Sequence, residues 1–300
     1  MKQNLKTAAV VCLLAATGTM SSCKKDVKVL SNDSTTSPRA IYDTIDEKFN
    51  SFANGAYYYE GSYISKFGNN SSNNWFYDRT YISNPTGNAS LRIKLMPMAT
   101  EGASGVLGRT NIIPRNIYHV SYRVKFSANM DLAEGGKLGV GLGMGPVLSG
   151  ENNGVKPNVN GSQGGSARLM WKRDGANWKL KPYLYYTNMP VDSKGKYYGT
   201  NIVYTNVYPS SGSISRDTWY TVDMTATSNT GTSNNGTINI KINGTTVLYN
   251  NQIYWGNNSP DQSNGIIKAV MFDTFRGGND STWESNSNDS YIYYDDIIVN

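Results

Sequence analysis

The amino-acid sequence predicts an all-β protein folded as a single-domain jelly-roll β-sandwich. Three observations support this fold class. Several segments alternate apolar and polar residues with a period of two, which is typical of strands with one buried face. The composition, with 30 glycines and abundant Asn, Ser and Thr, indicates many turns and few helices. The length of 300 residues, with a 38% hydrophobic fraction, is enough for one sizeable core.

The clearest strand signal lies in residues 118–126 (YHVSYRVKF), where apolar or aromatic residues alternate with polar ones. Residues 91–95 (LRIKL) show the same alternation over a shorter stretch. In residues 237–249 three isoleucines share one face before Asn243-Gly244, a dipeptide typical of a tight hairpin turn. Many short strands separated by turns favour a sandwich or a jelly roll. Further strands are expected at residues 219–226, 266–275 and 291–299.

The first 22 residues have the features of a bacterial lipoprotein signal peptide. Lys2 and Lys6 give a basic start, and residues 7–18 form an apolar run too short to span a membrane as a mature helix. Residues 20–22 then precede Cys23 in a pattern that resembles a lipobox, so Cys23 is the expected lipidation site. The alternative is an ordinary secretory signal followed by an incidental cysteine.

The cysteine count favours lipidation. The only other cysteine, Cys12, lies in the segment that processing removes, so the mature chain has no internal disulfide. We therefore expect a lipid-anchored protein of the outer membrane or the cell surface. Residues 23–50 are interpreted as the lipidated cysteine and a flexible tether, and residues 51–300 as the folded domain. Residues 45–52 (IDEKFNSF) weakly favour one or two turns of helix.

The mature chain is mildly basic. Without Lys2 and Lys6 it has 26 basic and 22 acidic residues, a formal net charge of +4. This balance is compatible with an acidic ligand without requiring one. We expect a monomer that binds no nucleic acid.

A glycine-rich run, GGKLGVGLGMG (residues 135–145), has a glycine at every second position over its later part. A nucleotide-binding loop would lead into a helix, but Pro146 follows the run and no helical periodicity appears after it. The alternation instead predicts a strand or loop with one face stripped of side chains, which something bulky can approach closely. Lys137 stands at the entrance to this run, and its default interpretation is a surface lysine.

His119 is the only histidine of the chain, and it shares a strand face with Arg123 and Lys125. A Ser-His-Asp triad would need it, and a zinc site would need further ligands that the sequence does not offer. The face that carries His119 is either solvated or part of a cleft. We expect no metal in the site.

Paired carboxylates would indicate glycoside hydrolysis. Asp295 and Asp296 are adjacent, and neighbouring strand residues point to opposite faces, so they form a poor acid–base pair. Asp273 and Glu134 are isolated in the sequence. A hydrolase with carboxylates far apart in sequence, and a structural calcium ion at Asp295 or Asp296, stay open as alternatives.

The stretch GSARLMWKRDGANWKLKPYLYY (residues 165–186) contains two expected strands around a turn at residues 173–175. Ser166 and Arg168 project from one face of the first strand, and Tyr183 and Tyr185 project together from the second. If the two strands pair, all four side chains can meet on one face. The alternative is a solvent-exposed polar rim with two half-buried tyrosines.

These segments together resemble polysaccharide lyase family 14. The resemblance rests on GGKL (135–138), SARLMW (166–171) followed by RDG, and the Y-x-Y of residues 183–185. Four further blocks support it, and it covers most of the chain from about residue 85. These blocks are ASLRIKLMP (89–97), YHVSYRVKF (118–126), TINIKINGTTV (237–247), and FDTFRGGNDSTW (272–283) with YIYYDDIIV (291–299).

The resemblance implies a β-jelly roll that cleaves alginate or another uronate polymer by β-elimination. It also implies catalytic roles for Lys137, Ser166, Arg168, Tyr183 and Tyr185. The chain departs from the family pattern after GGKL, where Gly139-Val140-Gly141-Leu142 replaces the more usual proline. It departs again at Arg276, where an aromatic residue is common. His119, Arg123, Lys172 and Arg276 are the expected additional substrate contacts.

The chemistry of such a lyase explains these residue types. Arg168 and Lys137 would stabilise the enolate-like intermediate formed when the C5 proton of a uronate is removed. Ser166 would donate a hydrogen bond to the same carboxyl group. Nearby cations are expected to lower the pKa of a tyrosine, so either Tyr185 or neutral Lys137 can serve as the base. We expect an alkaline optimum and no cofactor. A glycan-binding surface lipoprotein without turnover is the alternative.

Overall fold

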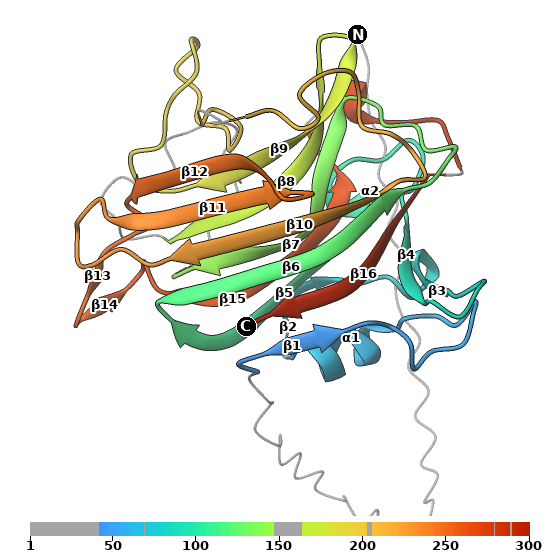
Figure 1. The fold of residues 1–300 in the computed structure, drawn as a ribbon, viewed down its shortest axis with the longest axis horizontal. Helices are drawn as coiled ribbons and strands as arrows, with labels where there is room; N and C mark the ends of the chain where they lie inside the picture. The colour runs from blue at the N-terminus through green and yellow to red at the C-terminus, as the bar shows by residue number, and fades with distance from the viewer. Residues whose placement is uncertain (1–41, 69, 147–163, 203–205, 279, 289) are drawn as a thin grey trace, which may run out of the picture. The chain divides into compact units, whose positions relative to one another are not determined.

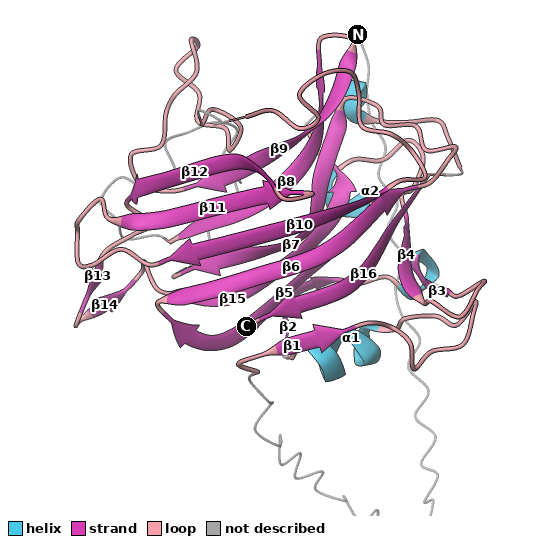
Figure 2. Ribbon diagram, viewed as in Figure 1, coloured by secondary structure: helices cyan, strands magenta, loops and turns pink. Residues whose placement is uncertain are grey.

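The computed structural model describes residues 42–300 except residues 69, 147–163, 203–205, 279 and 289. The described chain forms two large antiparallel β-sheets, one of eight strands and one of six, together with one two-stranded sheet and very little helix (Figures 1 and 2). The predicted all-β sandwich is therefore confirmed. The signal peptide, Cys23 and the tether up to residue 41 lie outside the described residues. No described helix is long and apolar enough to cross a membrane.

The eight-stranded sheet has the order β12-β11-β10-β6-β16-β4-β3, and β1 also pairs with β16. Its strands are β1 (Ile45–Glu47), β3 (Thr80–Ser83), β4 (Ser90–Lys94), β6 (Ile117–Phe126), β10 (Trp219–Thr227), β11 (Gly236–Ile242), β12 (Thr245–Ile253) and β16 (Tyr291–Val299).

The six-stranded sheet has the order β2-β5-β15-β7-β8-β9. Its strands are β2 (Asn70–Asn74), β5 (Val106–Arg115), β7 (Gly135–Met144), β8 (Gly165–Asp174), β9 (Asn177–Tyr185) and β15 (Ile267–Arg276). The remaining elements are short: α1 (Glu60–Phe67), η1 (Tyr77–Arg79), α2 (Glu101–Ser104), the hairpin β13 (Asn258–Ser259) and β14 (Gln262–Ser263), and η2 (Ser281–Trp283).

The core fills the space between the inner faces of the two sheets. Along β6 every second residue is fully buried and the intervening ones are partly exposed, as the alternation in the sequence predicts. Phe126 of β6 packs edge-on against Trp171 of β8, with ring centroids 5.9 Å apart. Phe272 of β15 meets Tyr294 of β16 at 5.0 Å. Each such large apolar side chain contributes about 1.5–3 kcal/mol by leaving water.

The helical turn expected at residues 45–52 is wrong, because Ile45–Glu47 forms strand β1 and pairs with β16. Ile45 and Glu47 point inward and are buried, whereas Asp46 is exposed. The Glu47 carboxylate accepts hydrogen bonds from the Phe49 backbone N–H (2.7 Å) and the Tyr58 hydroxyl (3.2 Å). This strand lies within residues 23–50, the stretch interpreted from the sequence as tether.

The expectation that Asp295 and Asp296 point to opposite faces is also wrong. The pairing of β16 with β6 shifts register between Asp295 and Ile298, and Asp296 has φ +50°, so the strand bulges there. The bulge brings both carboxylates to one guanidinium, with Arg123 Nη1 at 3.5 Å from Asp295 and 3.3 Å from Asp296. Among the residues that the structure describes, no group of three or more metal-ligating side chains gathers there or elsewhere.

Candidate functional site

The outward face of the six-stranded sheet brings Ser166, Arg168, Tyr183 and Tyr185 together. In the β8–β9 register Ser166 opposes Tyr185, and Arg168 opposes Tyr183. Trp171, of opposite parity on β8, points into the core. Because side chains of a strand alternate between faces, the four polar residues lie on the side away from the core.

Lys137 of β7 joins the same face. It opposes Met170 of β8, which has the parity of Arg168. Its Nζ lies 4.2 Å from the centroid of the Tyr183 ring, a cation–π contact. A side chain at Gly277 would come within 2.9 Å of this Nζ, so the glycine leaves room for the lysine. All five residues expected to be catalytic therefore form one group, which we call the lysine–tyrosine cluster: Lys137, Ser166, Arg168, Tyr183 and Tyr185.

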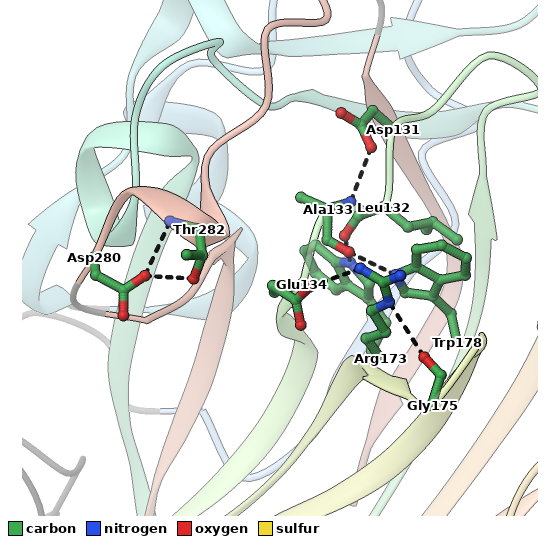
Figure 3. Close-up of polar contacts among 10 residues, drawn as sticks. Asp131, Leu132, Ala133, Glu134, Arg173, Gly175, Trp178, Asp280 and Thr282 are labelled. Carbon is green, nitrogen blue, oxygen red and sulfur yellow. Dashed lines mark hydrogen bonds and ion pairs between the residues drawn. The ribbon is translucent and has the colours of Figure 1, made fainter.

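The loop that leads into β7 is tied to the β8–β9 hairpin (Figure 3). Arg173 Nη1 lies 3.0 Å from the Glu134 carboxylate, and the Trp178 indole N–H donates to the Ala133 carbonyl at 2.6 Å. The Asp131 carboxylate accepts from the Ala133 backbone N–H at 3.0 Å. These contacts hold the start of β7 against the hairpin, and so fix Lys137 relative to the tyrosines. Figure 3 also shows Asp280 capping the turn that begins η2 through Thr282.

Arg168 forms a buried ion pair with Asp273 of β15. Arg168 Nη1 lies 2.6 Å from Asp273 Oδ2, and the two side chains are 2% and 0% exposed. In the described part of the chain, Nε and Nη2 of Arg168 and Oδ1 of Asp273 have no hydrogen-bond partner. Buried polar groups are normally satisfied, so this pair retains unused hydrogen-bonding capacity at the cluster.

Gly141 explains how the arginine fits. A Cβ on Gly141 would lie 2.6 Å from Arg168 Cγ and 2.3 Å from the Ala167 carbonyl oxygen. The glycine-rich run was expected to let a bulky group approach its backbone closely. In the structure this group is the Arg168 side chain. Gly139 serves the opposite face: it has φ +64°, and a Cβ there would meet the Tyr294 ring at 2.7 Å. The register of β7 with β8 shifts between Leu138 and Leu142, which is why the two glycines face different sides.

The two tyrosines share a hydrogen bond. Their hydroxyl oxygens are 2.9 Å apart, and their rings meet edge-on at 5.4 Å. Tyr183 is 8% exposed and Tyr185 is 2% exposed. Burial, followed by the neighbouring Tyr185, raises the pKa of Tyr183 well above its usual value, although Arg168 opposes the shift. For Tyr183 the expectation that cations lower the tyrosine pKa is therefore wrong, because desolvation outweighs the charge.

The pKa of Lys137 shifts in the opposite direction. Burial lowers its pKa from 10.5 to about 7, and the positive charges of Arg168 and Lys172 add to this shift. Desolvation and like charges both disfavour an ammonium group. A substantial fraction of Lys137 is consequently neutral at physiological pH, which makes it a competent proton acceptor.

Further cations line the same face toward the hairpin turn. Lys172 has the parity of Arg168 on β8, and its Nζ lies 5.8 Å from the Trp283 ring centroid. Burial, followed by Lys181, lowers the pKa of Lys172. Lys181 opposes Met170 and pairs with Asp174 at 3.1 Å. The cluster thus continues into a positively charged strip. Lys172, one of the four expected substrate contacts, lies in this strip.

The structure does not bring the other three expected substrate contacts to the cluster. Arg276 opposes Gly136 on the inner face of β15 and is fully buried. Its guanidinium donates to the Met96 carbonyl (3.1 Å), the Asp131 carbonyl (3.2 Å) and the Ser290 hydroxyl (2.7 Å). It therefore ties loops together inside the protein, where a sugar has no access.

His119 and Arg123 lie on β6, on the outward face of the other sheet. His119 Nε2 is 3.6 Å from Asp223, at a hollow of about 340 Å³ on that face. Thr225, Asn239, Lys241 and Gly244 complete its lining. The hollow lies on a different sheet from the lysine–tyrosine cluster, so it is not part of the candidate active site.

Sequence reasoning missed Asp273, the buried partner of Arg168, because this carboxylate looked isolated. The available signal was its position directly after the apolar run of residues 269–272 and two residues before Phe275. Phe275 shares the outward face and lies 5.9 Å from Lys137 Nζ. An acidic residue at a buried strand position needs a cationic partner, and only the strand order β15-β7-β8 reveals which cation it is.

Buried cations and tyrosines thus gather on one outward face of a β-sandwich. Such a face is suited to binding an anionic ligand. Residues 103–297 match the model of the family described as polysaccharide lyase 14. The structure of alginate lyase Aly36B is 34% identical, with a TM-score of 0.72, covering 87% of this chain and 97% of that chain. This chain therefore belongs to polysaccharide lyase family 14.

Two other solved structures help to place the chain. A variant of Aly36B with one lysine and one tyrosine replaced by alanine, in complex with an alginate tetrasaccharide, is 34% identical with a TM-score of 0.71. It covers 87% of this chain and 97% of that chain. The family 14 alginate lyase of the marine animal Aplysia kurodai is 19% identical with a TM-score of 0.61, covering 87% and 99%, and shows the shared fold. No curated protein matches the chain.

Proposed function

We propose that this member of the lyase family cleaves a uronate-containing polysaccharide, such as alginate or polyglucuronate, by β-elimination. The observation that carries the proposal is Lys137: a lysine whose pKa is lowered to about 7, in contact with a hydrogen-bonded tyrosine pair. In this reaction a base removes the C5 proton of a uronate. The bond from C4 to the glycosidic oxygen then breaks, the oxygen leaves with a proton, and a C4=C5 double bond forms.

Neutral Lys137 is the proposed base. Its pKa lies near physiological pH, where a base combines availability with proton-accepting strength. Buried Tyr183 resists ionisation, so it is a poor proton acceptor in the resting site. The hydroxyl pair is suited instead to supply a proton to the leaving oxygen from Tyr185. Tyr183 keeps its own proton and can donate it in a hydrogen bond to the Tyr185 oxygen, which stabilises Tyr185 as it gives up its proton.

Positive charge supports the developing enolate. Arg168 lies almost wholly beneath the surface, where a fixed charge acts through a medium of low dielectric and is worth far more than in water. Lys172 and Lys181 are partly exposed and positioned to contact uronate carboxylates along the strip. Asp273 holds the Arg168 guanidinium, which makes it a positioning residue for this charge.

The substrate class is supported by the relatives as well as by charge. Two Aly36B variants have been solved in complex with alginate oligosaccharides, one with a tetrasaccharide and one with a trisaccharide. Alginate is a polymer of uronates, and every sugar unit carries one carboxylate to match a cationic strip. The lipobox-like pattern around Cys23 further supports a lipid-anchored enzyme at the outer membrane or cell surface. Metabolic labelling with a palmitate analogue, lost in Cys23→Ser, tests this anchoring.

The test of the reaction is ultraviolet absorbance from the new C4=C5 double bond. Purified protein is offered alginate, polyglucuronate and pectate at neutral and alkaline pH, with Tyr185→Phe as the matched variant. The expected result is a rise in absorbance on at least one uronate polymer that the variant loses. Binding of these polymers without any rise would overturn the proposal in favour of a glycan-binding lipoprotein.

A further inference from the structure

The outward face of the eight-stranded sheet carries a row of aromatic and cationic side chains that the proposed reaction does not use. Tyr81 of β3 opposes Arg92 of β4, and Arg92 opposes Tyr293 of β16. Tyr293 in turn opposes Lys125 of β6, and Lys125 opposes Trp219 of β10. Five adjacent strands thus contribute one residue each to a line that runs across the sheet, alternating ring and cation.

The contacts along the first part of this row are cation–π and ring–ring contacts. The Arg92 guanidinium carbon lies 5.0 Å from the Tyr81 ring centroid and 4.9 Å from that of Tyr291. Tyr57 extends the row beyond Tyr81, with centroids 4.8 Å apart, and Tyr59 follows at 5.7 Å. Tyr57 and Tyr59 are 40% and 52% exposed, so this end of the row faces solvent.

The second part repeats the pattern. Lys125 Nζ lies 4.9 Å from the Tyr293 ring centroid and 5.4 Å from that of Trp219. The Arg123 guanidinium carbon lies 4.8 Å from Trp219 on the same strand face. The two cations are 22% and 32% exposed, and the rings between them are only partly covered. The row is therefore an accessible surface and not part of the core.

The charge along the row is uneven. Lys125 pairs with Asp217 at 2.9 Å, and Arg123 lies against Asp295 and Asp296. No described acidic side chain forms an ion pair with Arg92, nor with Lys94, which opposes Tyr291. Positive charge thus remains available at the β4 end, whereas the exposed carboxylates of Asp217 and Asp296 can accept hydrogen bonds from hydroxyl groups.

We propose that this aromatic–cationic row is a second, non-catalytic binding site for an acidic polysaccharide. Sugar rings stack their C–H faces on aromatic side chains, and uronate carboxylates pair with cations. Neighbouring strands are about 4.8 Å apart, so the row from Tyr81 to Trp219 extends over about 19 Å. One 1,4-linked pyranose unit advances a polysaccharide chain by a distance similar to the spacing between two strands. Successive units of one polymer can therefore meet successive side chains of the row.

A membrane surface is the competing occupant, because tyrosine, tryptophan and basic residues also favour lipid headgroups. The arrangement favours the polymer, because five side chains, one from each of five neighbouring strands, form a line in strand register that one extended chain can follow.

The identity of the polymer rests on the proposed function, whereas the existence of the site does not. Binding and turnover are therefore measured separately on the full chain. Binding is followed by affinity electrophoresis in gels containing alginate polymer, in a Lys137→Ala background so that no substrate is consumed. Turnover is followed by ultraviolet absorbance on an alginate trisaccharide, in the chain with Lys137 intact.

The test variant combines Trp219→Ala with Tyr293→Ala, and Arg92→Gln serves as a second, milder variant at a solvent-facing position. Tyr249→Ala is the matched control, because this tyrosine is 56% exposed on β12 of the same sheet but lies outside the row. We expect affinity for the polymer to fall about tenfold in the double variant and less in Arg92→Gln. Turnover of the trisaccharide should be unchanged in both row variants. The polymer affinity of the Tyr249→Ala control should also be unchanged.

Three outcomes would overturn the proposal. Unchanged polymer affinity in both variants would mean that the row only stabilises the sheet, whether or not the melting temperature falls. Row-dependent binding to vesicles of anionic phospholipid, without polymer binding, would identify a membrane surface instead. Equal loss in the Tyr249→Ala control would show that the effect is not specific to the row. Absence of any turnover, with row-dependent polymer binding retained, would reject only the proposed function.

Discussion

The two outward faces of the sandwich use the same residue types in different physical states. On the six-stranded sheet the Arg168 side chain is 2% exposed and forms a buried ion pair with Asp273. On the eight-stranded sheet the Arg123 side chain is 32% exposed and lies between a tryptophan ring and two carboxylates. Loss of water shifts pKa values and strengthens charges, whereas exposed charges keep their hydration.

Burial, more than residue type, therefore separates the face that we propose to be catalytic from the face that we propose only to bind a polymer. Lys137 and Lys125 both contact aromatic rings, at 4.2 Å and 4.9 Å. Only Lys137 is sufficiently desolvated, and sufficiently close to other cations, for its pKa to fall to about 7. Four predictions test this contrast between the two faces, beginning with the change that should reduce turnover most.

Replacing the base should have the largest effect on turnover. Lys137→Ala removes the proposed proton acceptor, so kcat should fall by about a hundredfold to ten-thousandfold. Lys125→Ala, the matched change on the other face, should leave kcat on an alginate trisaccharide within about twofold, because Lys125 lies on the other sheet, away from the lysine–tyrosine cluster. Steady-state kinetics by ultraviolet absorbance measures both. Equal losses of kcat in the two variants would contradict the proposal that only the face of the six-stranded sheet is catalytic.

Breaking the buried ion pair should have the largest effect on stability. Arg168→Met leaves the carboxylate of Asp273 buried without its partner and should cost about 3–5 kcal/mol in the free energy of unfolding. The counterpart on the other sheet is the pair of Lys125 with the exposed Asp217, and Lys125→Met should cost no more than about 1 kcal/mol. Denaturant unfolding measures both variants.

A double variant separates the two roles of this arginine. Arg168→Met with Asp273→Leu removes both buried charges and should recover most of the lost stability, because an apolar pair of similar volume needs no ion-pair compensation. It should not recover turnover, since the charge that supports the enolate is gone. Recovery of activity in the double variant would mean that Arg168 has no electrostatic role in the reaction.

The pH dependence should follow Lys137. Because the neutral amine is the proposed base, kcat should rise as pH increases through about 7 and level off at alkaline pH. The same pKa shift affects folding: between about 7 and 10.5 the unfolded chain binds a proton that the folded chain does not. Stability from this group therefore rises with pH across that window.

The control for the pH prediction is Lys137→Met, which should lose the rise in stability between neutral and alkaline pH while remaining folded. Unfolding by urea at a series of pH values, on both proteins, isolates the contribution of this lysine. A wild-type activity profile that peaks at acidic pH would be incompatible with a lysine base.

The smallest effect on turnover is expected at Arg276. Its guanidinium bonds two carbonyls and a serine inside the protein, so Arg276→Met should cost about 1–3 kcal/mol of stability by leaving these acceptors unsatisfied. KM for a uronate substrate should not change, because the side chain lies on the inner face of β15. Comparison of thermal melting with KM tests this, and a raised KM at unchanged melting temperature would restore Arg276 as a substrate contact.

Much of the fold followed from the sequence because a strand with one buried face has a pattern of period two. The alternation in residues 118–126 gave the correct inner face of β6, and the hairpin at residues 165–186 gave the correct partners. The short strand at Ile45–Glu47 was missed because three residues are too few to show a period. The bulge at Asp296 was missed because a positive φ at an aspartate leaves no pattern in the sequence.

The candidate site was predictable to the extent that its residues lie on neighbouring positions of one hairpin. Ser166, Arg168, Tyr183 and Tyr185 meet through local pairing alone. Asp273 lies more than a hundred residues from Arg168 and joins it through the strand order of the sheet, which alternation does not encode. The raised pKa of Tyr183 was also out of reach, because it depends on burial and not on residue type.

The most direct test of the central claim is the pKa of the Lys137 side-chain amine itself, measured by NMR in protein with isotopically labelled lysine. Lys137→Arg assigns the signal by its disappearance. The expected titration midpoint is near 7, well below the ordinary lysine value of 10.5. A midpoint near 10.5 would contradict the assignment of Lys137 as the base, because its amine would then be almost fully protonated at physiological pH.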